Sequence, residues 1–152
     1  MLADDYVARV DVPGFDRAMM DGFAVFAADC AGATAYNRLP LNVIGEALPG
    51  RPCEKTVARG QAVRVMTGAP MPTEPDAVLP VERTETENEQ VFAIGDVAAG
   101  KHIGRRGEDI RAGNTVLTAG RRLRPQDVGV LSSIGAAELQ VVRRPRVRIV
   151  VT

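Results

Sequence analysis

The segment 12–24, with the sequence VPGFDRAMMDGFA, constrains the fold more than any other part of the chain. Val12 precedes a proline and is therefore pushed toward extended geometry, and Pro13-Gly14 favours a turn, so the segment cannot form a helix. Asp21-Gly22 follows two methionines and precedes an apolar run, which predicts a second tight turn of the hairpin type. A loop anchored in this way can hold the carboxylate in a fixed place. The alternative is that the aspartate only shapes the turn, since Asp-Gly is common in turns.

The middle of the chain has the pattern of a mostly β unit. Short runs of β-branched or alternating apolar residues recur there between Gly and Pro clusters. This pattern predicts strands over residues 6–12, 23–27, 39–47, 61–66, 77–82 and 90–94. Pro80 cannot donate a hydrogen bond to a neighbouring strand, so we expect its strand at an edge of the sheet or at a bulge.

Thr67 stands at the end of one predicted strand. Alternate residues of a strand share a face, so Val63, Val65 and Thr67 point the same way. If the valines face the core, the Thr67 hydroxyl points into the rim of that core, and the turn that begins at Gly68 follows at once. A hydroxyl beside free backbone N–H groups can bind an oxygen-rich ligand. A threonine that caps its own turn is the alternative.

A second polar cluster contains Arg105 and Arg106, which have glycines on both sides. Guanidinium groups bind oxyanions in a bidentate manner, which makes this pair a candidate anion site. An internal ion-pair patch that joins the two arginines to Glu108 and Asp109 is an equally good interpretation. His102 lies alone in the loop before this cluster, and such a histidine is more often a bystander than a ligand.

The C-terminal part of the chain predicts a short helix between Pro125 and Gly135, since proline favours the first helical position and glycine ends a helix. The residues that recur there at helical spacing, and should face a core, are Val128, Leu131 and Ile134. Two strands are predicted after the helix, over 138–143 and 147–151. The second is of a buried type and has no element after it to cover it, so we expect the chain to be a piece of a longer protein.

The composition argues against several classes of function. Lys and Arg number 19, Asp and Glu also number 19, and aromatic residues make up 4%, which counts against a nucleic-acid-binding domain. No apolar run approaches the roughly 20 residues that span a bilayer. Cys30 and Cys53 lie too far apart for a CxxC pair, so the sequence predicts neither a zinc site nor a disulfide framework. A reducing cytoplasm is the expected compartment.

Six short motifs occur in register across nearly the whole chain. They are DVPGFD (11–16), MDGFAV (20–25), RVMTGAP (64–70), DAV (76–78), RGEDI (106–110) and RPRV (144–147). Each motif alone is weak, but together they resemble the molybdenum insertase family, which includes bacterial MoeA (molybdopterin molybdenumtransferase) and the E domain of gephyrin. The chain departs from the family pattern at Ala18-Met19, where the family usually has Ser-Ala, and at Phe23, which replaces the usual Tyr.

The resemblance implies a mainly β fold with a short helix. In the family, the stretch that matches residues 8–113 is a separate β-rich lobe with a bifurcated sheet. Residues 1–7 and 114–140 match parts of a linker domain. Residues 141–152 match the first strand of the α/β domain that binds molybdopterin, and we expect the rest of that domain to be absent from this chain.

The resemblance also implies chemistry. The family inserts molybdate into adenylylated molybdopterin, giving molybdenum cofactor, at a site that two subunits of a homodimer form together. The resemblance assigns catalytic roles to Asp21 and Thr67. The candidate substrate-binding residues are Gly22, Gly68, Arg105 and Arg106. The fragment alone is expected to be inactive, and a non-catalytic dimerisation or scaffold module of the gephyrin type is the alternative.

A carboxylate beside molybdate requires a physical reason, because two anions repel. One possibility is that a magnesium ion bridges Asp21 to phosphate or molybdate oxygens, since hard oxygen ligands suit this metal. The other is that Asp21 acts as a general acid or base in the exchange of oxygen for sulfur. Thr67 is expected to donate a hydrogen bond to an oxyanion. The sequence leaves both roles of Asp21 open.

Overall fold

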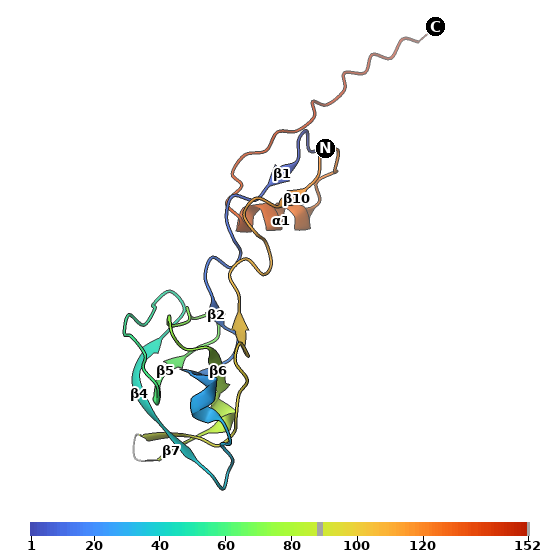
Figure 1. Ribbon diagram of the computed structural model, residues 1–152. Helices are drawn as coiled ribbons and strands as arrows, with labels where there is room; N and C mark the ends of the chain where they lie inside the picture. Colours follow the sequence, from blue (N-terminus) through green and yellow to red (C-terminus); the bar gives the residue numbers. More distant parts are fainter. Residues whose placement is uncertain (88–89, 152) are drawn as a thin grey trace. The chain divides into compact units, whose positions relative to one another are not determined.

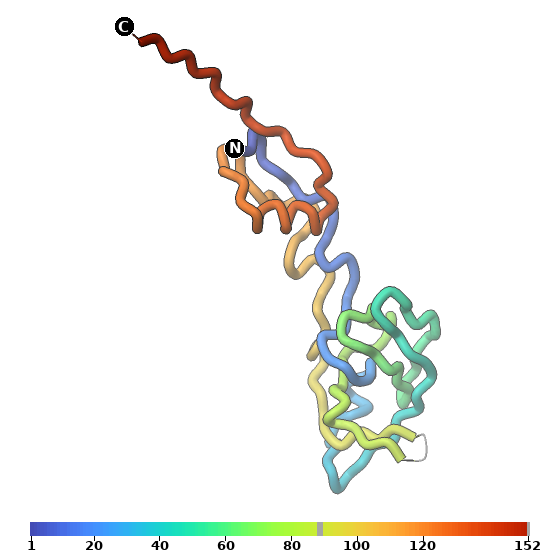
Figure 2. Tube along the Cα trace, turned by 180° about the vertical axis from the view of Figure 1, so that it is seen from behind, coloured from blue at the N-terminus to red at the C-terminus, as the bar shows by residue number. Residues whose placement is uncertain are grey.

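The computed structural model describes residues 1–87 and 90–151. The chain divides into two compact units. Pro13–Glu108 is here called the central unit, and Met1–Val12 with Asp109–Thr152 is called the terminal unit. Within the terminal unit, a segment near the N-terminus pairs with residues 115–117 from the later part of the chain (Figure 1, Figure 2). The described residues are mainly β with one short α-helix, which confirms the expected fold class.

The central unit is built on a six-stranded sheet with the order β6-β3-β5-β4-β8-β7 (Figure 1). Only the β4–β5 pair is parallel among these described strands, and the other neighbours are antiparallel. The strands are β3 (Gly22–Val25), β4 (Leu39–Ala47), β5 (Gln61–Val65), β6 (Ala77–Pro80), β7 (Thr84–Glu87) and β8 (Gln90–Ala93). The predicted strands between residues 23 and 94 are therefore confirmed, some with shorter ends.

The sheet curls because its two edge strands follow each other in the sequence. β6 and β7 lie at opposite ends of the strand order, and only the 3-10 turn η2 (Val81–Arg83) joins them. A link of three residues reaches about 10 Å at most, so the sheet must bend until its edges approach each other. Pro80 lies in β6, which confirms the expectation that its strand is at an edge.

Both faces of the curled sheet are buried. The residues here called the inner cluster come from β3, β4, β5, β6 and β8 and from the loops beside them: Phe23, Val25, Cys30, Ala33, Leu41, Ala62, Ala77, Leu79, Val91, Ala93 and Val97. Since strands from both ends of the sheet contribute to it, this cluster fills the concave side. Ala24, Val63 and Val65 alternate with inner residues and pack in a second cluster on the other side.

A separate two-stranded sheet contains β2 (Arg17–Ala18) and β9 (Ile103–Gly104). The predicted hairpin turn at Asp21-Gly22 is wrong, because β2 pairs with β9 whereas β3 pairs with β5 and β6. Gly22 lies inside β3, with partner strands on both sides. A Cβ atom at Gly22 would overlap the backbone carbonyl oxygen of Leu79. The glycine is required by this close approach of two backbones and not by a turn.

The terminal unit contains β1 (Tyr6–Val7), β10 (Thr115–Leu117) and α1 (Pro125–Ser133). β1 pairs with β10 in the antiparallel sense. The core of this unit consists of Leu2, Leu117, Leu131 and Ile134, with partly buried apolar residues around them. The predicted helix is therefore confirmed, and Gly135 just beyond it has a φ of 75°. None of the described helices is long and apolar enough to cross a membrane.

Two details of α1 differ from the expectation. Val128 is exposed, because the buried face of the helix contains Asp127 and Leu131 and continues to Ile134, and Val128 lies beside this face. Asp127 is buried at the third helical position, and it accepts hydrogen bonds from the Arg121 guanidinium and from the backbone N–H of Arg124. These bonds lower the pKa of Asp127, the Arg121 side chain contributing most.

Three predicted strands are not formed over their full lengths. The strand expected over 6–12 is limited to Tyr6–Val7, and the segment 138–143 contributes only an isolated bridge between Leu2 and Val141. Residues 147–151 form no strand. Their apolar side chains are mostly exposed, and a strand is not stable without a partner strand. The assignment of residues 141–152 to a further domain stays a prediction, and Thr152 lies outside the described residues.

We predict that Gly22→Ala and Gly129→Ala change stability in opposite directions. Gly22→Ala should destabilise the central unit by about 2 kcal/mol or more, because the new methyl group forces β3 and β6 apart. Gly129 lies in α1 with open space around its Cβ position. Gly129→Ala should therefore stabilise the terminal unit by about 1 kcal/mol. Urea unfolding, followed with a probe in each unit, measures both effects, and an unchanged midpoint for Gly22→Ala would contradict the close approach.

Candidate functional site

The register of two strands brings Asp21 and Thr67 together. Asp21 immediately precedes β3 and Thr67 follows the end of β5, and these strands pair with Gly22 opposite Val65. The backbone N–H of Thr67 donates a hydrogen bond of 2.8 Å to Oδ1 of Asp21. The Thr67 hydroxyl donates another, also of 2.8 Å, to the same oxygen. An ionised carboxylate only accepts hydrogen bonds, so the hydroxyl must be the donor.

The valines that precede Thr67 face a core, as the alternation predicts. Val63 and Val65 are fully buried, and Thr67 is exposed at the rim of their cluster. The hydroxyl bonds to a residue far away in the sequence, so the interpretation of Thr67 as a cap of its own turn is wrong. Gly68 begins the turn with a φ of 85°, and its backbone N–H donates to the carbonyl oxygen of Ala18.

The hydrogen bonds from Thr67 hold Asp21 in its ionised form. They lower the pKa of Asp21 below the ordinary value of 3.8, with the backbone N–H contributing most, the hydroxyl next, and the positive charge of Arg64 adding to both. Asp21 is exposed, and within the described part of the chain its other oxygen, Oδ2, has no hydrogen-bond partner. The site therefore presents a fixed negative charge with one open oxygen.

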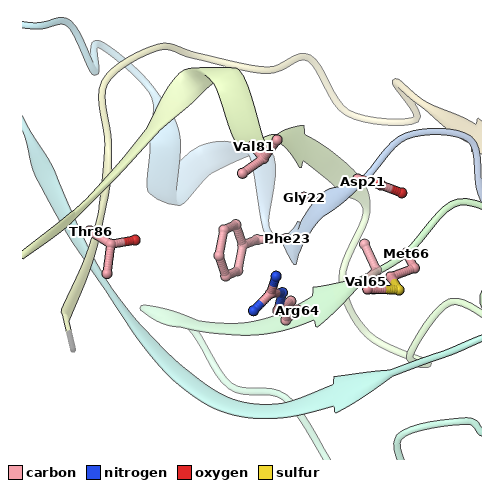
Figure 3. A pocket seen from close by; sticks show the side chains of 8 residues that line it. All are labelled: Asp21, Gly22, Phe23, Arg64, Val65, Met66, Val81 and Thr86. Carbon is pink, nitrogen blue, oxygen red and sulfur yellow. The ribbon is translucent and has the colours of Figure 1, made fainter.

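A pocket of about 230 Å³ adjoins Asp21 (Figure 3). Its lining consists of Asp21, Gly22, Phe23, Arg64, Val65, Met66, Val81 and Thr86. Phe23 and Arg64 lie in the middle of the view, whereas Asp21 stands at one edge and Thr86 at the other (Figure 3). The pocket thus combines apolar walls with one acidic and one basic side chain.

Arg105 and Arg106 lie in the loop after β9, and they do not line this pocket. The Arg105 guanidinium contacts Oδ2 of Asp16 at 2.6 Å, and the backbone N–H of Arg106 donates to Oδ1 of the same residue at 2.8 Å. These bonds lower the pKa of Asp16, the backbone bond from Arg106 contributing most. The Arg105 guanidinium therefore takes part in an ion pair, but its acid is Asp16 and not the predicted Glu108.

The candidate residues divide into three groups. Asp21 and Thr67 are in direct contact, and Gly22 supports them from within β3. Gly68 uses its N–H group within the fold. Arg105 and Arg106 belong to the Asp16 network, in which the N–H of Met71 also donates to the Asp16 carbonyl oxygen. Substrate binding stays a prediction for the four residues to which it was assigned, which are Gly22, Gly68, Arg105 and Arg106. Arg64 and Thr86 were not among the candidates.

One protein-family model matches most of the chain. The model for the MoeA N-terminal region (domain I and II) matches residues 1–135. The chain belongs to this family. The resemblance seen in the sequence motifs is thereby confirmed, and the mainly β fold matches a solved structure of a MoeA protein.

Curated relatives and solved structures match nearly the whole chain. It is 41% identical over 152 residues to "Molybdopterin molybdenumtransferase 2" of Mycobacterium tuberculosis, covering 100% of this chain and 38% of the relative. It is 39% identical over 155 residues to "Molybdopterin molybdenumtransferase" of Staphylococcus epidermidis, covering 100% of this chain and 36% of the relative. A crystal structure of the molybdopterin biosynthesis moeA protein from Pyrococcus horikoshii OT3 superposes with a TM-score of 0.86 at 38% identity, covering 91% of this chain and 36% of that chain. The chain thus spans a little more than a third of these proteins.

We predict that Thr67→Val raises the pKa of Asp21 toward its ordinary value, because the hydroxyl donor is lost while the backbone donor remains. Thr67→Ser keeps the hydroxyl and should leave the pKa low. Carboxyl-carbon NMR titrations of the two variants measure the difference. In the wild-type protein, the stability that these bonds contribute is present above pH 3.8 and is lost as the pH falls through the lowered pKa of Asp21. Equal pKa values in the two variants would contradict the role of the hydroxyl.

Proposed function

We propose that this chain is the N-terminal part of a molybdopterin molybdenumtransferase and that it acts in molybdenum cofactor biosynthesis. The names of its relatives support this function, as does its membership of the MoeA family. The observation that carries the proposal is the exposed, ionised carboxylate of Asp21, which Thr67 holds through two hydrogen bonds to one oxygen. This geometry leaves the second oxygen to act on a substrate.

The lowered pKa of Asp21 argues against a general acid among its expected roles. A general acid must carry a proton at the working pH, and a carboxyl group with a pKa below 3.8 is ionised at neutral pH. Asp21 is therefore better suited to bind a cation or to accept a proton or a hydrogen bond. An open carboxylate oxygen of this kind can position molybdate through a shared metal ion, or it can orient the group that molybdate attacks.

Magnesium fits this donor set only together with substrate. In the part of the chain that the structure describes, no group of three or more Asp, Glu, His or Cys side chains is arranged to hold a metal ion. Magnesium is commonly bound by one or two carboxylates together with substrate phosphates and water. Asp21 would supply one oxygen in such a site, and the metal would neutralise charge between that oxygen and an anionic substrate.

Thr67 has a different role from the one expected. Its hydroxyl hydrogen points to Asp21 and is therefore not free to donate to an oxyanion. We assign Thr67 as a positioning residue, which fixes the direction of the carboxylate and keeps it ionised. Replacement of the hydroxyl should act through the pKa and orientation of Asp21.

The rest of the active site lies outside this chain in our proposal. The curated relatives are more than twice as long, and this chain covers only 38% of the Mycobacterium tuberculosis protein. We expect the remaining part to bind molybdopterin, and a homodimer in the cytoplasm to join the two parts. The chain by itself should then be inactive.

We predict that Asp21→Ala abolishes cofactor synthesis in a complete enzyme. Residues 1–152 would replace the matching part of the Mycobacterium tuberculosis relative, and the chimera would be expressed in a bacterium that lacks its own molybdenumtransferase. The wild-type chimera should restore the activity of a molybdenum enzyme, and Asp21→Ala should lower the rate of restoration about 100-fold.

Asp96→Asn is the matched control, because Asp96 is an exposed acid outside the pocket whose side chain is 75% exposed. It should leave restoration unchanged. Full activity of the Asp21→Ala chimera would rule out the catalytic role of Asp21. It would favour the alternative hypothesis, a non-catalytic scaffold module. A wild-type chimera that restores nothing would contradict the proposed function itself.

A further inference from the structure

The inner face of the curled sheet is largely apolar. Alternate residues of β3, β5 and β6 on this face belong to the inner cluster, including Phe23, Ala62 and Leu79. Arg64 lies two residues after Ala62 in the same strand and directly opposite Phe23, so it shares their face. The inner face of β5 therefore carries two residues: Ala62, which is buried in the inner cluster, and the charged Arg64 near the end of the strand.

Thr86 is a second polar residue on the inner face. It pairs in register with Val91 of the inner cluster, so its side chain is on the concave side of β7. Its hydroxyl oxygen is turned toward Phe23 and Arg64 (Figure 3). Both Arg64 and Thr86 line the 230 Å³ pocket, and both residues are exposed.

No acid in the described part of the chain pairs with Arg64. Glu46 lies opposite it on β4, but its carboxylate contacts Arg51 at 3.2 Å. Asp21 and Arg64 interact through the attraction between their opposite charges and form no hydrogen bond, because the hydrogen bonds of Asp21 go to Thr67. A guanidinium group carries five N–H donors, and those of Arg64 are directed to no other described residue.

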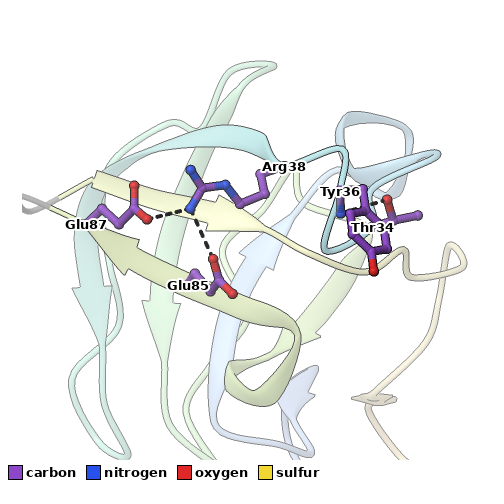
Figure 4. Close-up of polar contacts among 5 residues, drawn as sticks. All are labelled: Thr34, Tyr36, Arg38, Glu85 and Glu87. Atoms are coloured by element: carbon purple, nitrogen blue, oxygen red, sulfur yellow. Dashed lines mark hydrogen bonds and ion pairs between the residues drawn. The ribbon is translucent and has the colours of Figure 1, made fainter.

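The acids of β7 are held on the opposite face of the strand. Glu85 and Glu87 flank Thr86 in the sequence and therefore point away from the pocket. Both contact the Arg38 guanidinium, at 3.1 Å and 2.5 Å, and Figure 4 shows the single arginine between the two carboxylates. The fold thus keeps negative charge out of this side of the pocket.

We infer that Arg64 and Thr86 form an oxyanion-binding site in this pocket, for a tetrahedral anion such as phosphate or molybdate. The guanidinium offers two parallel N–H donors, which match two oxygens of such an anion, and the Thr86 hydroxyl offers a further donor. The inference deepens the proposed function and rests on it for the identity of the anion, which is either a phosphate group of the pterin substrate or molybdate itself.

The charge of Arg64 also explains how an anion can be bound near Asp21. Two negative groups in one pocket repel each other, and a single guanidinium between apolar walls offsets part of that repulsion. Arg64 is the one basic residue among the residues that line the described pocket. Its removal should therefore weaken anion binding more than the loss of any other single charge on the chain.

The test is a titration of the full chain with inorganic phosphate and, separately, with molybdate, measured by isothermal titration calorimetry. The wild-type protein should bind at least one anion with a stoichiometry of one. Arg64→Gln should weaken that binding by about tenfold or more, and Thr86→Val by about threefold. Arg59→Gln is the matched control, since it removes the same charge from a side chain that is 61% exposed and does not line the pocket.

Each outcome decides the inference. Selective binding of phosphate points to the phosphate group of the substrate, and selective binding of molybdate points to the inserted ion. The inference is overturned by a wild-type protein that binds neither anion, by an Arg64→Gln variant with wild-type affinity and a wild-type melting temperature, or by equal weakening in Arg59→Gln.

The proposed function fails in a different way. A wild-type chimera that restores no cofactor synthesis would remove that function, while anion binding that depends on Arg64 would still stand. Conversely, a chimera that needs Asp21 combined with anion binding that ignores Arg64 would remove only the oxyanion site.

Discussion

The candidate site depends on the register in which β3 pairs with β5. A slip of one residue would turn every side chain of β3 to the other face and would separate Asp21 from Thr67. The observed register is fixed from both sides, because β3 lies between β6 and β5. Its residues also alternate between two buried clusters. Gly22 tolerates the close backbone of β6 only because it has no side chain. The position of the carboxylate is therefore a consequence of core packing.

The same pairing places opposite charges in one pocket without joining them. Asp21 is held by neutral donors of Thr67, and Arg64 is left without an acidic partner in the described chain. A direct ion pair between the two would have satisfied both groups and closed the site. Their separation leaves an acceptor at the edge of the pocket and a donor in its middle, which suits a ligand that carries negative oxygens and shares a cation with the protein.

Several features could be predicted from the sequence because they depend on local geometry. The alternation of Val63 and Val65 indicated that the two valines share one buried face, and Pro80 predicted an edge strand. The hairpin at Asp21-Gly22 was wrong because a glycine can be required by a close approach of strands as well as by a turn. The contact between Thr67 and Asp21 could not be predicted, since it depends on which strands become neighbours. Arg64 was missed because a single arginine in a strand is usually a solvated residue. Its side chain is exposed, and only the pairing of β5 with β3 shows that it shares a face with Phe23 and lines the pocket.

The most direct test of this account is a pH titration of the wild-type protein followed at the backbone amide of Thr67 by NMR. This amide donates the hydrogen bond that contributes most to the lowered pKa of Asp21. The account predicts a single transition in the Thr67 amide shift with a midpoint below pH 3.8, and its loss in Asp21→Asn. An amide shift that does not change with pH, or that titrates equally in Asp21→Asn, would contradict it.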